Sequence, residues 1–115
     1  MQLLGLVFVG SATPGRGAME RFAETTRGLR RVAVQGTGAA MFELPDGSHF
    51  AVDDEREPGS GTSRTVGFLV ADLDAAIAEL VTAGIAVDDP AETDRARYAH
   101  FVAPDGKLYE LIEER

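Results

Sequence analysis

The first half of the chain has a pattern of apolar and polar positions that predicts one strand, one helix and three further strands. The continuous apolar run from Leu3 to Val9 is typical of a strand. Met19, Phe22 and Ala23 are spaced as on one face of a helix, which we expect to end near Gly28. The three remaining strands are expected over residues 30–35, 39–44 and 48–52.

The second half repeats this order of elements. A strand is expected over residues 65–70, and the helix after it begins with Asp72 as its N-cap and stops at Gly84. The apolar stripe of that helix consists of Leu73, Ile77, Leu80 and Val81. Further strands are expected over residues 85–87, 98–103 and 107–112, with an acidic loop over 88–94.

A hairpin signal occurs once in each half, and the two copies match. A Pro-Asp-Gly turn lies at Pro45–Gly47 and recurs 59 residues later at Pro104–Gly106, each time preceded by a phenylalanine and followed by an aromatic residue. At matched positions of the strands that follow the turns, Ala51 stands in the first copy and Glu110 in the second. We infer a duplicated β-α-β-β-β module, in which the two copies bring different chemistry.

Length and composition fit one domain. We expect a single α+β domain over residues 1–115, with module one over about 1–56, a Gly/Ser-containing linker over about 57–63 and module two over about 64–115. The 115 residues are 44% hydrophobic and 26% charged, which is typical of a globular chain rather than a disordered one.

Charge and residue usage narrow the classes of partner. The formal net charge of −8 argues against nucleic-acid binding, which needs clustered Lys and Arg. The same charge either favours a cationic small ligand or only serves solubility. We expect no membrane association, because no apolar run reaches the roughly 20 residues needed to span a bilayer. The absence of cysteine and of a basic segment before the first apolar run fits a cytoplasmic protein.

Two segments carry a resemblance to a known family. The residues from Gly67 to Ile85 and from Tyr98 to Leu111, together with Met19–Leu29 and the Pro45–Gly47 hairpin, are similar to the vicinal oxygen chelate superfamily of glyoxalases, extradiol dioxygenases and bleomycin-resistance proteins. The resemblance covers nearly the whole chain. It implies two tandem β-α-β-β-β modules that form curled mixed sheets around a cavity, in a protein that is commonly a homodimer.

The resemblance also implies positions for a divalent metal. Metal-dependent members use a His or Gln on the first strand of each module and a Glu on the last strand. The first-strand positions are expected at Leu4 or Leu6 and at Thr65, and the last-strand positions at Ala51 and Glu110. Because a catalytic metal site needs about three protein ligands, and only Glu110 is a competent one, we expect no metal and no cofactor.

Several individual side chains are candidates for binding a ligand. Alternation places Glu110 on one face of its strand and Leu111 on the other, and the resemblance implies that Glu110 faces the cavity. His100 and Glu110 are each five residues from the hairpin centre at Asp105, so they are expected to be cross-strand neighbours, either as a functional Glu–His dyad or with a structural histidine. The further candidates for the cavity wall are Thr65, Ala51, Leu4 and Phe42, and the weaker ones are His49 and Arg97.

Three functional hypotheses follow. The leading one is a metal-free protein that binds a small organic molecule, with a cationic ligand favoured, in a mostly apolar cavity. The second is a divalent-metal-dependent lyase, isomerase or dioxygenase of the same superfamily. The third is a non-catalytic dimerisation module whose cavity is filled by side chains.

Overall fold

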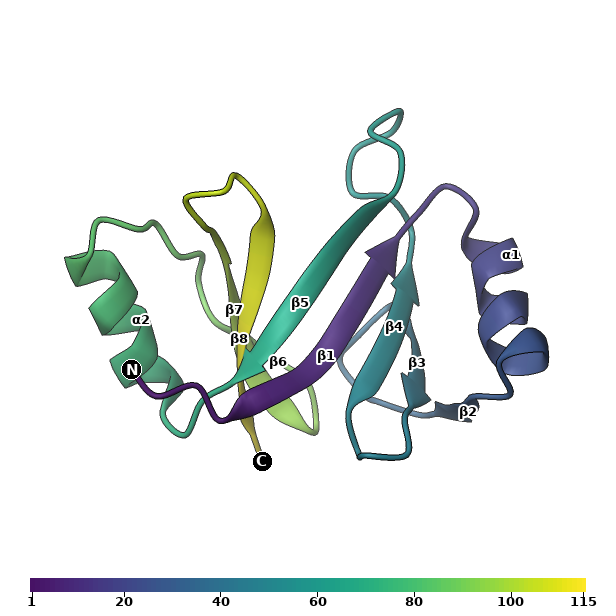
Figure 1. Cartoon of the computed structure of the whole chain (residues 1–115), viewed down its shortest axis with the longest axis horizontal. Helices are drawn as coiled ribbons and strands as arrows, with labels where there is room; N and C mark the ends of the chain where they lie inside the picture. Colours follow the sequence, from purple (N-terminus) through teal and green to yellow (C-terminus); the bar gives the residue numbers. More distant parts are fainter.

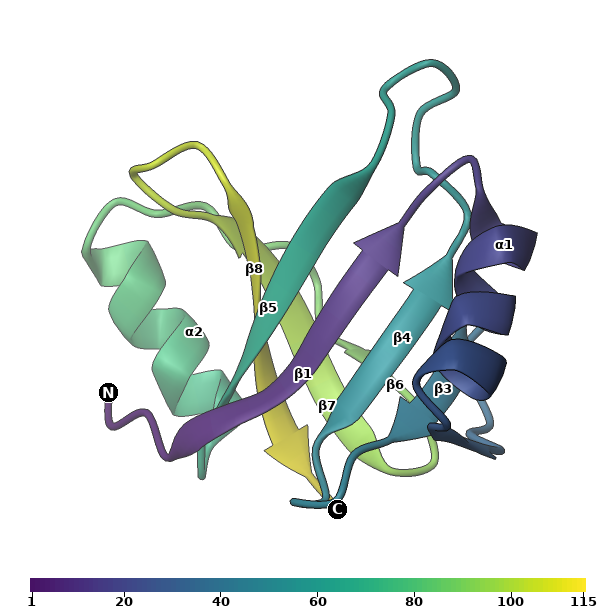
Figure 2. The same cartoon turned by 45° about the vertical axis from the view of Figure 1, so that its right-hand side comes forward.

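The computed structural model describes residues 1–115, which form eight strands and two helical segments around one curled sheet (Figures 1 and 2). The elements of module one are β1 (Gly5–Ala12), α1 (Arg16–Arg21), a π-helical continuation η1 (Phe22–Thr26), β2 (Arg30–Val32), β3 (Ala40–Glu43) and β4 (His49–Asp53). Those of module two are β5 (Ser63–Leu69), α2 (Leu73–Thr82), β6 (Ala91–Glu92), β7 (Ala96–Val102) and β8 (Leu108–Glu114). The α+β class and the repeated β-α-β-β-β order are confirmed, and no helix is long and apolar enough to cross a membrane.

The two modules share one mixed sheet in the order β2-β3-β4-β1-β5-β8-β7-β6. Within each module the first strand pairs in parallel with the last, β1 with β4 and β5 with β8. The first strands of the two modules pair antiparallel at the centre of the sheet. Because strands twist, this long sheet curls, and Figure 1 shows α1 and α2 at its two opposite ends, outside the curl.

Each helix covers its own part of the sheet and makes its own core. Leu73 of α2 is buried with Ala99 and Leu111, which lie on the outer face of β7 and β8. In module one, Ala23 is buried against the sheet residues Phe42 and Val52. The helices therefore occupy the outer face of the curl and leave its inner face free for a cavity. Asp72 caps α2 as expected, since its side chain accepts a hydrogen bond from the backbone NH of Ala75.

The edges of the sheet differ from the sequence expectation. The strand expected over 85–87 is reduced to a single bridge between Val87 and Phe101, and the short strand β6 forms in the segment expected as an acidic loop. The strand expected over 30–35 stops at Val32. It stops because the next residues leave the sheet to contact the opposite edge.

A set of hydrogen bonds, here called the 35–94 clasp, joins the segments that follow the two edge strands β2 and β6. The Asp94 backbone NH donates to the Gln35 carbonyl at 2.9 Å, and the Gln35 backbone NH donates to Oδ1 of Asp94 at 3.1 Å. The guanidinium of Arg95 also donates to the Ala33 carbonyl at 3.3 Å. The curled sheet is therefore closed across its open side, and the cavity has a wall there.

Gly67 on β5 is required by close packing inside the curl. A Cβ atom at this position would lie 2.6 Å from Cδ1 of Ile112 and 2.8 Å from Cβ of Phe8. We expect Gly67→Ala to lower the free energy of unfolding by about 1–3 kcal/mol, because the added methyl group overpacks the site. Chemical denaturation measures the loss.

Gly38→Ala is the matched control, because a Cβ there meets nothing within 4 Å. A second change, Ile112→Val, removes the nearer contacting atom and is expected to cost less in the Gly67→Ala background than in the wild type. Equal stabilities for the Gly67→Ala and Gly38→Ala proteins would contradict this packing.

Candidate functional site

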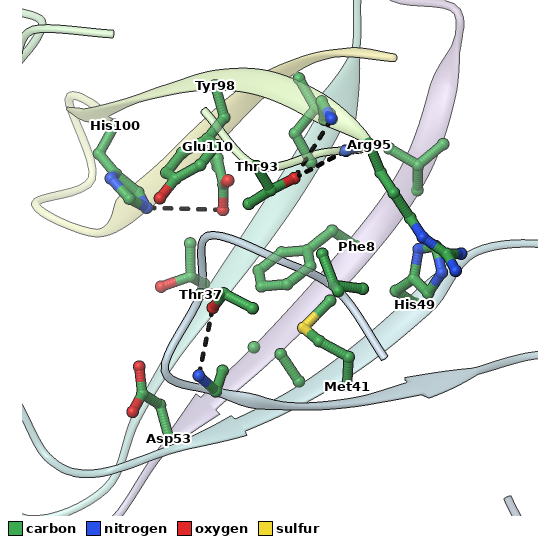
Figure 3. A pocket seen from close by; sticks show the side chains of 18 of the residues that line it. Phe8, Thr37, Met41, His49, Asp53, Thr93, Arg95, Tyr98, His100 and Glu110 are labelled. Carbon is green, nitrogen blue, oxygen red and sulfur yellow. Dashed lines mark hydrogen bonds and ion pairs between the residues drawn. The ribbon is translucent and has the colours of Figure 1, made fainter. Parts of the chain in front are cut away.

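The inner face of the curled sheet encloses a cavity of about 190 Å³ (Figure 3). Its wall comes from strands of both modules and from the segments around the 35–94 clasp. The lining residues are Val7, Phe8, Gly10, Ser11, Ala12, Val34, Thr37, Ala39, Met41, His49, Ala51, Asp53, Arg56, Thr65, Thr93, Arg95, Ala96, Tyr98, His100, Glu110, Ile112 and Glu114. Ten of these 22 residues are hydrophobic, so the wall is a mixed surface on which polar groups can act as specific anchors.

Glu110 and His100 form a polar pair on this wall. They are directly opposite each other on β8 and β7, as expected, and Oε2 of Glu110 lies 3.5 Å from Nε2 of His100. The Glu110 side chain is only 8% exposed, whereas Leu111 points to the other face and packs against α2. Alternation along β8 therefore presents a buried carboxyl group to the cavity.

The His100 ring is held from three sides. Its Nδ1 lies 3.4 Å from Oδ2 of Asp88, and Oδ1 of the same carboxylate accepts the His100 backbone NH at 2.6 Å. The Nη2 atom of Arg56 lies 3.4 Å from Nε2. These contacts orient the ring so that Nε2 faces Glu110. The Arg56 contact comes from module one, so both modules shape this pair.

Tyr98 lies two residues before His100 on the same face of β7. The two rings meet edge to face with centroids 5.6 Å apart. Burial raises the pKa of the Tyr98 phenol above its ordinary value, and the charge of Glu110 raises it further. The phenol therefore stays protonated at neutral pH and keeps a hydrogen-bond donor at the cavity wall.

A second polar group lines the cavity away from this pair (Figure 3). The Nε2 atom of His49 is buried and has no hydrogen-bond partner. Leaving a polar atom buried without a partner costs about 1–3 kcal/mol, so such an atom calls for an explanation. Arg95 also lines the cavity, and its guanidinium has one hydrogen bond, to the Ala33 carbonyl.

Comparison with known proteins identifies the architecture. No protein-family model and no curated protein matches the chain. Among solved structures, methylmalonyl-CoA epimerase from Mycobacterium tuberculosis matches with a TM-score of 0.79 and 19% identity, over 98% of this chain and 89% of that one. A Streptomyces coelicolor methylmalonyl-CoA epimerase variant in complex with 2-nitronate-propionyl-CoA matches with a TM-score of 0.73 and 23% identity, over 97% and 98%. A hypothetical protein from Bacillus halodurans matches with a TM-score of 0.73 and 19% identity, over 96% and 94%.

The chain has the vicinal oxygen chelate fold. The resemblance found in the sequence is therefore confirmed at the level of the fold. Several of the matching structures are named as epimerases, a class of isomerase, and another is named as a benzaldehyde dehydrogenase. Because these structures are all less than 25% identical to the chain, the likeness shows the fold alone.

Strand pairing corrects one of the four metal positions that the vicinal oxygen chelate resemblance implies. Gly10 is opposite Ala51 in module one, and Gly67 is opposite Glu110 in module two. The residue two places before Gly67 is Thr65, so its counterpart in module one is Phe8, two places before Gly10. The expected assignment to Leu4 or Leu6 is wrong.

The residues at the four positions do not fit a divalent cation. They are Phe8, Ala51, Thr65 and Glu110, and all four line the cavity. A phenyl ring and a methyl group cannot coordinate, which leaves one carboxylate and one neutral hydroxyl. The chain also holds no cluster of three or more His, Cys, Asp or Glu side chains spaced for a metal ion. The chain therefore has the vicinal oxygen chelate fold without a set of protein ligands that fits a divalent metal.

Two of the expected wall residues lie outside the cavity. Leu4 precedes β1, is 52% exposed, and its backbone NH donates to the Leu69 carbonyl. Phe42 is 0% exposed in the core beneath the first helix. On β3 it is the neighbouring residue, Met41, that lines the cavity, because successive side chains point to opposite faces.

Most of the other predicted site residues line the cavity. Glu110, His100, Thr65 and Ala51 all line the cavity, and so does His49. Arg97 does not; it forms a surface ion pair in which Nη2 lies 3.2 Å from Oδ1 of Asp74.

Sequence reasoning missed three polar side chains of the cavity wall: Tyr98, Arg56 and Arg95. Tyr98 could have been found, because it shares a strand face with His100. Arg56 and Arg95 lie between strands, where no periodic pattern indicates direction.

Proposed function

We propose that this protein is an isomerase-type enzyme that moves a proton on a small organic carbonyl compound, with Glu110 as the base. The observation that carries the proposal is the buried Glu110 carboxyl group at the cavity wall, paired with His100 at 3.5 Å. The epimerase titles of the structural neighbours support the same class of chemistry. The fold alone would not be sufficient, because one fold hosts many functions.

The chemistry follows from what each group can do. The Glu110 carboxylate takes a proton from the carbon next to a carbonyl, and the C–H electron pair moves into the carbonyl to give an enolate. The Tyr98 phenol, protonated at neutral pH, is suited to donate a hydrogen bond to the oxygen that gains charge. Return of the proton from Glu110 to a different carbon, or to the same carbon after the substrate turns, completes the reaction.

Solvent exchange tests this step directly. We expect the protein to catalyse deuterium incorporation from D₂O into methylmalonyl-CoA or propionyl-CoA, two compounds with an acidic C–H bond beside a thioester. Glu110→Gln should lower the rate about 10²–10⁴-fold, because that is the usual contribution of a positioned base. Mass spectrometry of the recovered thioester measures the exchange.

The control is Glu57→Gln, which makes the same charge change at an exposed residue outside the cavity. Exchange that is equally fast in the Glu110→Gln and wild-type proteins would overturn the assignment of Glu110. A wild-type protein that exchanges no deuterium into any carbonyl compound it binds would overturn the isomerase itself.

The second candidate function is a metal-free binding protein for a small organic molecule. The apolar residues Phe8 and Ala51, at two of the four positions where metal ligands are implied, favour it. If this second function holds, a bound compound should raise the melting temperature of the protein but should take up no deuterium from D₂O. The homodimer stays a prediction in either case, and the cationic ligand stays a prediction for the binding protein.

A further inference from the structure

We propose that His49 and Arg95 form an anion-binding subsite at one end of the cavity, where the substrate places a carboxylate or another oxyanion. The inference rests on the proposed function, because it assigns a substrate class to the same cavity. It makes the substrate an organic anion, whereas the net charge of the chain favours a cation.

Strand directions place both side chains at the same end of the sheet. His49 is the first residue of β4, and Arg95 immediately precedes β7. Since β4 is parallel to β1, β1 is antiparallel to β5, β5 is parallel to β8 and β8 is antiparallel to β7, the starts of β4 and β7 lie at one end. Figure 3 shows both side chains on the side of the cavity away from Glu110 and His100.

One ring nitrogen of His49 lacks a hydrogen-bond partner. Its Nε2 is buried, and no protein group bonds to it. Buried polar atoms in folded proteins nearly always have a partner from protein, water or ligand. A ligand oxygen beside this nitrogen would supply the missing hydrogen bond.

Arg95 supplies the positive charge of the subsite. Its guanidinium has one hydrogen bond, at 3.3 Å to the Ala33 carbonyl, and no carboxylate within ion-pair distance. Of the nine other arginines, five are paired with at least one carboxylate: Arg16, Arg30, Arg31, Arg97 and Arg115. Among the four others only Arg56 lines the cavity, and it lies at the opposite end, beside His100. In a chain with 19 acidic residues, an arginine at a cavity wall without such a pair keeps its charge available for a ligand. Glu114 also lines this end, and both Glu114 and Arg95 are exposed to solvent.

The chemistry that fits these two groups is an oxyanion with at least two oxygens. A guanidinium binds a carboxylate or phosphate through charge-assisted hydrogen bonds, and one oxygen can accept a further bond from an imidazole N–H. The other end of such a molecule then extends toward Glu110, the proposed base. Two polar sites at opposite ends of one cavity would give the substrate a single orientation.

The chain offers a direct readout, because its only two histidines report on the two ends of the cavity. We suggest titrating ¹⁵N-labelled protein with sodium malonate at constant ionic strength and following the imidazole signals by NMR. We expect the His49 ring signals to shift with saturation. Arg95→Gln should weaken malonate binding on the order of tenfold, because it removes one charge-assisted pair.

Arg64→Gln is the matched control, because Arg64 is exposed, lies outside the cavity and has the same charge. It should leave malonate affinity unchanged. A malonate response confined to His100, equal weakening by both arginine changes, or a His49 response to tetramethylammonium but not to malonate would each overturn the subsite. Glu110→Gln should retain the malonate response, so failure of the proposed base and failure of this subsite are distinguishable.

Discussion

Replacing Phe42 by alanine should lower the free energy of unfolding by about 3–5 kcal/mol, the range for removing a fully buried phenyl ring from a core. Phe42 is 0% exposed and packs with Ala23 and Val52 beneath the first helix. Because domains of this size are stable by about 5–15 kcal/mol, the variant should lose a large share of its stability. Urea denaturation followed by circular dichroism measures the shift in midpoint.

Met41→Ala is the matched control for this prediction. Met41 neighbours Phe42 on the same strand, but it faces the cavity and is only half-buried. Its truncation enlarges a space that already exists, so it should cost clearly less than the Phe42 change. Equal losses for the two variants would contradict the assignment of Phe42 to the core and Met41 to the cavity wall.

Rebuilding the missing ligands should create a metal site where this chain does not have one. The triple change Phe8→His, Ala51→Glu and Thr65→His would place two imidazoles and a carboxylate beside Glu110, at positions that all line one cavity. Four such donors suit Zn²⁺ or Co²⁺. We expect affinity to rise at least about a thousandfold, to micromolar or tighter, since coordination replaces a single carboxylate contact. Metal content after dialysis and the Co²⁺ absorption spectrum measure the gain.

Adding Glu110→Ala to the triple variant should weaken the new site, because one of its four ligands is lost. The wild-type protein serves as the comparison. One equivalent of tightly held divalent metal in the wild type, removed by Glu110→Ala alone, would contradict the conclusion that this donor set does not fit a metal.

The second hairpin shows why part of the site could be predicted from sequence. His100 and Glu110 are equally far from the centre of a short turn, so their pairing follows from counting residues. The geometry of the hairpin determines which residues are cross-strand neighbours, and tertiary packing changes this pairing little. The face that Glu110 presents then follows from strand alternation and the covered side of the sheet.

In the first strand, the residues that face the cavity could not be predicted by counting positions along the sequence. A continuous apolar run has no alternation, so nothing in Leu3–Val9 indicates which residues face the cavity. In addition, the register between β1 and β5 shifts between Leu6 and Phe8, which changes the matching of positions by one residue. These two properties explain why Phe8, rather than Leu4 or Leu6, holds the position equivalent to Thr65.

The loop residues of the site depend on contacts between modules. Arg95 has its position because the segment after β6 bonds to the segment after β2. Residues 35 and 94 are far apart in the sequence and carry no pattern that links them. Only the curl of the whole sheet brings them together, so neither the cavity wall there nor the anion subsite follows from local sequence.

The 35–94 clasp has a mechanical consequence. The two modules are joined on one side of the cavity by the β1–β5 pairing and on the other side by the clasp, so together they make a ring. A pair of bodies joined at one seam can open like a hinge, but a ring cannot widen without breaking bonds at one of its joins. The diameter of the cavity is therefore held by hydrogen bonds at both seams, and a ligand too large for it must first release the weaker of the two.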